Sequence, residues 1–308
     1  MVIALRHNLD EDSPNSSIAQ RPVSIKRIIA LHPRERLFVQ PLLWTNRQLA
    51  LLGCRIHVRD EASCGSGLGV VPRDWPAPKN GNRVDGKLLS LLTRLRKRQP
   101  IADELEDTVR RLLRLASGSV LLKPNRVASL EFEGRSCASF PYCRITAGNA
   151  TFALFDAHDI AQERYRLFKP PPTKFAAMDL PGVQRCNRLL KRYMPTEHEK
   201  DPYLVAFVIA LAQQSRRHMM QQEPALSAVT VRILFSSKRS PISFNTFVAH
   251  VPVTFLHKLD TPAQEPPLGS DLDIHHCRVS LEPFENLPHR LLHCLARDYA
   301  EKTRGQNE

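Results

Sequence analysis

The sequence predicts an α+β protein in which an antiparallel sheet packs against a buried central helix, with additional helices around it. Three observations indicate this class. They are an unbroken apolar segment with helix-start signals at residues 201–214, strand-like segments before and after it, and leucine-rich segments with helical spacing. The chain has 308 residues, 42% hydrophobic and 24% charged, which is the composition of an ordinary globular protein.

The chain is expected to divide into three parts. These are a disordered N-terminus, an N-terminal segment with a long Gly/Pro-rich loop, and a main α+β domain, at residues 1–20, 21–84 and 85–304. The N-terminus is polar and buries too little apolar area to offset the cost of ordering it. The loop, from about residue 62 to residue 86, is rich in Gly, Pro, Asn and Asp, so a domain boundary is expected there.

Elements are expected in the following order. Apolar runs between residues 23 and 52 are too short to assign, and Cys54, Ile56 and Val58 then alternate as in a short strand. Segments with helical spacing predict helices at 87–98, 102–116, 156–167, 184–193, 254–259 and 288–300. Segments that alternate or are β-branched and aromatic predict strands at 127–132, 143–146, 151–155, 229–235, 244–251 and 272–279.

The central helix has its start signal in the sequence. Asp201 can cap the helix N-terminus, and Pro202 suits the first turn, where a missing N–H costs nothing. Residues 203–212 are apolar on every side, so this helix is expected to be surrounded by other elements. The apolar segment is shorter than the roughly 20 residues that a membrane span requires, and we expect no membrane insertion.

The formal net charge of +13 indicates an anionic partner, either nucleic acid or an acidic protein. The residues predicted to bind anions form two short basic clusters, Arg94, Arg96, Lys97, Arg98 and Arg188, Lys191, Arg192. The alternative is that these cations only solvate helix faces. Aromatic residues make up 6% of the chain, which predicts phosphate contact rather than a base-stacking platform.

A row of polar residues in the last predicted strand suggests a metal site. Asp271, Asp273, His275 and Cys277 would share one face, because side chains in a strand alternate between two faces. Two histidines four residues apart on the closing helix, His289 and His293, could add ligands for a metal such as zinc. The alternative is the polar face of an edge strand beside surface histidines. Otherwise no cofactor is predicted.

Other familiar sites do not fit the sequence. The glycine-rich run at residues 65–69 has Val70 where a dinucleotide fingerprint needs its third glycine, and Cys64 and Leu68 where a nucleophile elbow needs glycines. The predicted strands at 229–236 and 244–251 contain no Asp or Glu to place the metal of a nuclease. No complete catalytic set is present.

The seven cysteines are odd in number, and no two form a C-x-x-C motif. Reduced thiols, and therefore a cytoplasmic or nuclear location, fit this pattern best. The start of the chain lacks the apolar region of a secretory signal, because the run at residues 2–5 ends at Arg6.

Two segments carry a resemblance. The block Asp201-Pro202-Tyr203 through Ile209-Ala210-Leu211-Ala212-Gln213, with residues 249–259, resembles a block in uncharacterised intracellular proteins of filamentous fungi. The resemblance covers roughly the last third of the chain and implies a fungal origin and an α+β module, without any catalytic residue. The sequence thus favours a non-catalytic binding or interaction module for an anionic partner. The alternative is a metal-dependent enzyme that uses the His/Asp/Cys residues near the C-terminus.

Overall fold

The computed structural model describes residues 23–37, 39–59, 86–97, 102–148, 150–171, 179–220, 226–237 and 243–296. The predicted disordered N-terminus lies outside these residues. The predicted Gly/Pro-rich loop also lies outside them, apart from Gly86, which begins a helix.

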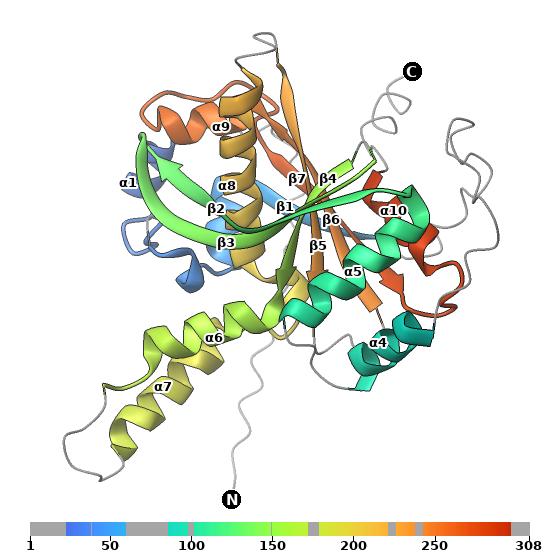
Figure 1. Ribbon diagram of the computed structural model, residues 1–308. Coiled ribbons are helices and arrows are strands. Elements are labelled where there is room, and N and C mark those ends of the chain that lie inside the picture. Colours follow the sequence, from blue (N-terminus) through green and yellow to red (C-terminus); the bar gives the residue numbers. More distant parts are fainter. Residues whose placement is uncertain are drawn as a thin grey trace, which may run out of the picture.

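The described strands form one seven-stranded sheet in the order β1-β7-β6-β5-β4-β3-β2 (Figure 1). They are β1 (Cys54–Arg59), β2 (Val120–Phe132), β3 (Arg135–Ala147), β4 (Ala150–Asp156), β5 (Ala228–Ser236), β6 (Ser243–Pro252) and β7 (Leu272–Ser280). Two pairs, β1 with β7 and β4 with β5, are parallel, and the other neighbours are antiparallel. The prediction of an antiparallel sheet was therefore wrong, because a parallel pair needs a long crossover connection and three helices lie between β4 and β5.

Helices cover both faces of this sheet, which confirms the α+β class. They are α1 (Ile25–Leu31), α2 (Asn46–Leu52), α4 (Gly86–Lys97), α5 (Ala102–Ser117), α6 (Ala157–Phe168), α7 (Leu180–Tyr193), α8 (Pro202–Met219), α9 (Val253–Asp260) and α10 (Leu287–Ala296), with short 3-10 turns η1 (Pro41–Leu43) and η2 (His198–Lys200). One apolar cluster joins α1, α2, α8 and α9 to one face, and a second joins α4, α5 and α10 to the other. The N-terminal segment supplies the edge strand β1 to the same sheet.

Helix α8 is the buried central helix that the sequence predicts. The Asp201 carboxylate accepts a hydrogen bond from the Tyr203 N–H at 2.9 Å, and Pro202 occupies the first turn. Every residue from Pro202 to Gln213 is buried. The helix continues for six residues beyond that stretch, to Met219, where its polar end reaches the surface.

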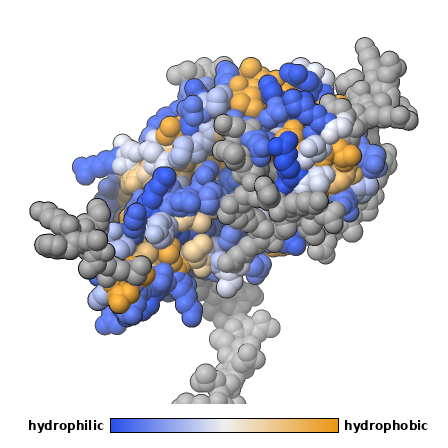
Figure 2. Space-filling view, turned by 60° about the horizontal axis from the view of Figure 1, so that its bottom comes forward, coloured by the Kyte–Doolittle hydropathy of each residue, from blue (hydrophilic) through white to orange (hydrophobic). Residues whose placement is uncertain are grey.

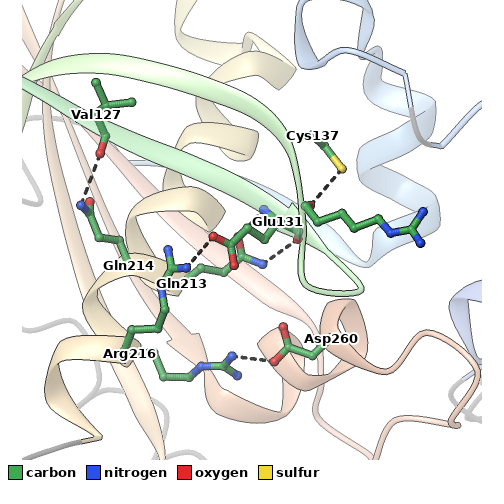
Figure 3. Close-up of polar contacts among 9 residues, drawn as sticks. Val127, Glu131, Cys137, Gln213, Gln214, Arg216 and Asp260 are labelled. Carbon is green, nitrogen blue, oxygen red and sulfur yellow. Dashed lines mark hydrogen bonds and ion pairs between the residues drawn. The ribbon is translucent and has the colours of Figure 1, made fainter.

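The polar end of α8 also covers the outer edge of β2 (Figure 3). The amide of Gln213 accepts from the N–H of Glu131 at 2.9 Å and donates to its carbonyl at 2.8 Å, as a neighbouring strand would. Gln214 donates to the carbonyl of Val127, and Arg217 pairs with the Glu131 carboxylate. Backbone groups at a sheet edge otherwise invite pairing with another chain, so these amides satisfy and shield part of that edge.

Among the described residues, no helix combines the length and apolar character that crossing a membrane would require.

Candidate functional site

Helices α6 and α7 form an antiparallel hairpin that projects from the body of the molecule at the lower left of Figure 1. Helix α7 packs against α6, with the rings of Phe168 and Tyr193 stacked at a centroid distance of 5.7 Å. Cys186 is the buried residue of α7, and most of the remaining surface of this helix faces solvent. The hairpin is thus a surface feature that a partner can reach.

Local signals explain where α7 begins. The Asp179 carboxylate accepts a hydrogen bond from the Gly182 N–H at 3.0 Å, and Pro181 lies in the first turn. A Cβ at Gly182 would collide with the Asp179 side chain and would lie 2.9 Å from Cβ of Pro170. Glycine is therefore required there, and the helix starts at Leu180 rather than at the predicted residue 184.

The exposed face of α7 is cationic. Its exposed cations are Arg185, Arg188, Lys191 and Arg192. The helix contains no Asp or Glu, and none of these four side chains has an ion pair within the described parts of the chain. The Arg192 guanidinium lies 5.4 Å from the centroid of the Tyr193 ring. The helix therefore presents a row of positive charge that no carboxylate among the described residues pairs with.

The structure treats the two predicted anion-binding clusters differently. Arg188, Lys191 and Arg192 lie together on α7, and Arg185 joins them, although the sequence prediction omitted it. Its spacing of three residues from Arg188 and seven from Arg192 places it on the same side of a helix and could have revealed it.

In the other cluster, the exposed Arg94 on α4 forms an ion pair with Glu104 at 3.1 Å. Arg98 lies outside the described residues, and so do the side chains of Arg96 and Lys97. Helices α4 and α7 lie on different sides of the molecule in Figure 1, so Arg94 does not share a surface with the α7 cations.

A buried ion pair joins the hairpin to the core. Arg164 of α6, 1% exposed, donates two hydrogen bonds to the Asp201 carboxylate, at 2.6 and 2.7 Å. Its Nε–H donates to the carbonyl of Leu42 at 2.9 Å. Asp201 also caps α8, so one carboxylate connects the base of the hairpin to the start of the central helix.

A small pocket lies beside this ion pair. Arg164 and Asp201 line it together with His198, Phe235 and other residues. It has room for about one water molecule. Its size therefore argues against an organic ligand at this position.

The predicted metal row is engaged in ion pairs. Arg55 of β1 donates to both Asp271 and Asp273 at 3.1 Å, and His57 Nε2 lies 2.8 Å from the Asp273 carboxylate. Burial raises the pKa of Asp273, but the hydrogen bonds and charges of His57 and Arg55 outweigh it and hold that pKa below its usual value. Burial, with the nearby charges of Arg59 and His57, lowers the pKa of His275 to about 4.

The remaining predicted ligands lie apart from these carboxylates. Cys277 is buried in the second apolar cluster, with its Sγ 3.9 Å from Sγ of Cys294. His289 is exposed on α10, and His293 is partly buried there. No three His, Cys, Asp or Glu side chains of the described residues are grouped as metal ligands, so the metal site stays a prediction that this geometry does not support.

A second polar cluster, which sequence reasoning missed, lies buried around the middle of β7. His276, 1% exposed, donates from Nε2 to the Asn245 side chain at 3.0 Å and stacks on Phe247 with ring centroids 4.8 Å apart. The buried Glu199 accepts a hydrogen bond from Arg278 at 2.6 Å. Burial lowers the pKa of His276 to about 4, so the ring is neutral at pH 7.

Stability is therefore expected to fall in acid. In the unfolded chain His276 binds a proton below pH 6.5, whereas in the folded protein it stays neutral down to about pH 4. Its contribution to the free energy of unfolding is therefore full above pH 6.5 and is lost as the pH falls from 6.5 to about 4. The loss is about 3 kcal/mol. His276→Gln keeps a donor for Asn245 but does not titrate. In urea unfolding from pH 7 to pH 4, the advantage of the wild type over this variant should shrink, and a constant difference would contradict the assignment.

No protein family, curated protein or solved structure matches the chain.

Proposed function

We propose that this protein is a non-catalytic binding module for an anionic partner and that α7 supplies the binding surface. One observation carries the proposal: the row Arg185, Arg188, Lys191 and Arg192 stands on a projecting helix that contains no carboxylate. Figure 2, which turns the lower side of Figure 1 forward, shows described side chains that are mostly hydrophilic, with orange confined to separate patches. Electrostatic attraction is therefore the main interaction that this side offers.

Several cations elsewhere in the described residues have carboxylate partners. Arg216 pairs with Asp260, Arg217 with Glu131, and Arg278 with Glu199. Such pairs contribute little net field at a distance because the two charges cancel. The charges on α7 have no ion-pair partner among the described residues, and salt screens their field over roughly 8 to 10 Å at physiological ionic strength.

Stabilisation of the helix dipole explains only part of the row. Lys191 and Arg192 lie in the last turn of α7, where cations favour the helix. Arg185 and Arg188 lie before that turn, where the dipole contributes almost nothing. Their placement on the same exposed side supports a role outside the helix itself.

The triple variant Arg185→Gln, Arg188→Gln, Arg192→Gln tests the proposal. We expect salt-dependent binding of the wild type to at least one of three probes: a duplex DNA, a poly-glutamate peptide and phosphatidylserine vesicles. If the partner is the duplex, the slope of log K against log salt should fall by about 2 to 3 units in the variant, since each lost phosphate contact removes about 0.9.

The matched control removes the same charge from three exposed, ion-paired arginines, in the variant Arg27→Gln, Arg47→Gln, Arg110→Gln. Its binding should stay close to that of the wild type. The proposal is wrong if the control loses as much affinity as the α7 variant, or if the wild type binds none of the three probes.

A further inference from the structure

The geometry points to one partner for this surface: α7 inserts into the major groove of duplex DNA. This inference rests on the function proposed above and specifies its partner. It depends on the neutral side chains of α7 as much as on its charges, and on how the hairpin presents them.

Most exposed side chains of α7 are polar and lie on one side of the helix, which also carries the exposed Leu180 and Pro181 in its first turn. At 3.6 residues per turn, its exposed residues span roughly 160° of the helix circumference. Gln184, Arg188 and Lys191 lie at the centre of that face, Asn187 lies on one flank, and Arg185 with Arg192 lies on the other. The opposite side packs on α6, so this exposed face is turned away from α6.

This set of side chains matches the chemistry of base edges. Gln and Asn amides pair with adenine, and Arg and Lys donate to the acceptors of guanine in the major groove. Arginines on a flank are placed for phosphate oxygens, which fix the position of a helix on the duplex. The cations alone would match an acidic protein, whereas the exposed amides of Gln184 and Asn187 carry the donor and acceptor pair that adenine matches in the major groove.

The shape of the hairpin fits the groove. An α-helix with side chains is about 10–12 Å wide, and the major groove of B-form DNA is about 12 Å wide. Helix α7 stands on a projecting hairpin, so the body of the protein does not block a duplex lying along it (Figure 1). Duplex RNA is excluded as an equivalent partner because its major groove is deep and narrow.

The first experiment blocks the groove without changing the charge. Binding is measured by fluorescence anisotropy to a duplex DNA and to the same duplex with glucosylated hydroxymethylcytosines, which fill the major groove. We expect at least about tenfold weaker binding to the glucosylated duplex. Equal affinity for both duplexes would overturn the inference, as would equally tight binding to duplex RNA.

The second experiment removes the amides but no charge. In vitro selection from a random duplex library should enrich a sequence that the wild type binds at least about tenfold better than random DNA. Gln184→Ala with Asn187→Ala should lose that preference while keeping the salt slope. Gln162→Ala, an exposed amide on α6, is the matched control and should keep both.

These outcomes separate the inference from the proposed function. Binding to poly-glutamate or to vesicles without any groove dependence would leave an anion-binding module whose partner is an acidic protein or a lipid surface. Absence of binding to every probe would overturn both. Failure of the selection to enrich any sequence would overturn the groove inference alone.

Discussion

Replacing Asp201 with Asn is expected to lower the free energy of unfolding by about 3–5 kcal/mol. Asparagine keeps the shape of the side chain and an oxygen for the Tyr203 N–H, so the cap on α8 survives. The change removes the negative charge that Arg164 needs. A guanidinium that is 1% exposed would then remain in the core with the Leu42 carbonyl and a neutral amide as acceptors. Urea unfolding followed by circular dichroism measures the loss.

An exposed pair provides the control for this prediction. Glu163 pairs with Arg166 on the same helix, with side chains 47% and 69% exposed. Glu163→Gln should cost less than about 1 kcal/mol, because water already solvates both charges. The double variant Arg164→Met, Asp201→Asn should recover part of the stability lost by Asp201→Asn alone. A similar small loss for Asp201→Asn and Glu163→Gln would contradict the role of the buried pair.

Replacing Phe207 with Ala should cost a similar amount, about 3–5 kcal/mol. Phe207 is 0% exposed on α8, and its ring centroid lies 5.1 Å from that of Phe155 and 5.6 Å from those of Phe140 and Tyr142. These neighbours come from β3 and β4, so the ring joins the central helix to the sheet. Truncation removes apolar contact and leaves a cavity that the rigid sheet cannot close.

The matched control is Leu167→Ala on α6, a large apolar side chain that is 41% exposed. Its loss should stay within about 1 kcal/mol, because little contact is removed. The denaturant slope should be unchanged in both variants, which would show that the loss reflects stability rather than a new unfolded state. A loss below about 1 kcal/mol for Phe207→Ala would contradict the view of α8 as the centre of packing.

Part of the candidate site could be predicted from the chain alone. The positions of Arg188, Lys191 and Arg192 in a helix follow from spacing and composition. Their availability to a partner does not follow from the sequence. It depends on two tertiary features: α7 packs along one side only, against α6, and both helices lie in a crossover that projects from the sheet. Arg185 lies inside the predicted helix and its spacing could have placed it with the other cations, whereas the true start of the helix at Leu180 depends on a cap and a close glycine approach that composition does not reveal.

The sequence by itself determined the elements whose signals are local. Asp201, Pro202 and the unbroken apolar run specify where α8 begins and that it is buried, and alternation specifies β1 and β7, because capping, periodicity and apolar area act between near neighbours. Tertiary structure alone decided which strands pair. The parallel contact of β1 with β7 joins residues more than 200 positions apart, and it brings Arg55 to the carboxylates of the predicted metal row. The contact of Gln213 with the edge of β2 was also decided by the tertiary structure. Pairing between segments that are distant in the sequence depends on how all the elements pack together.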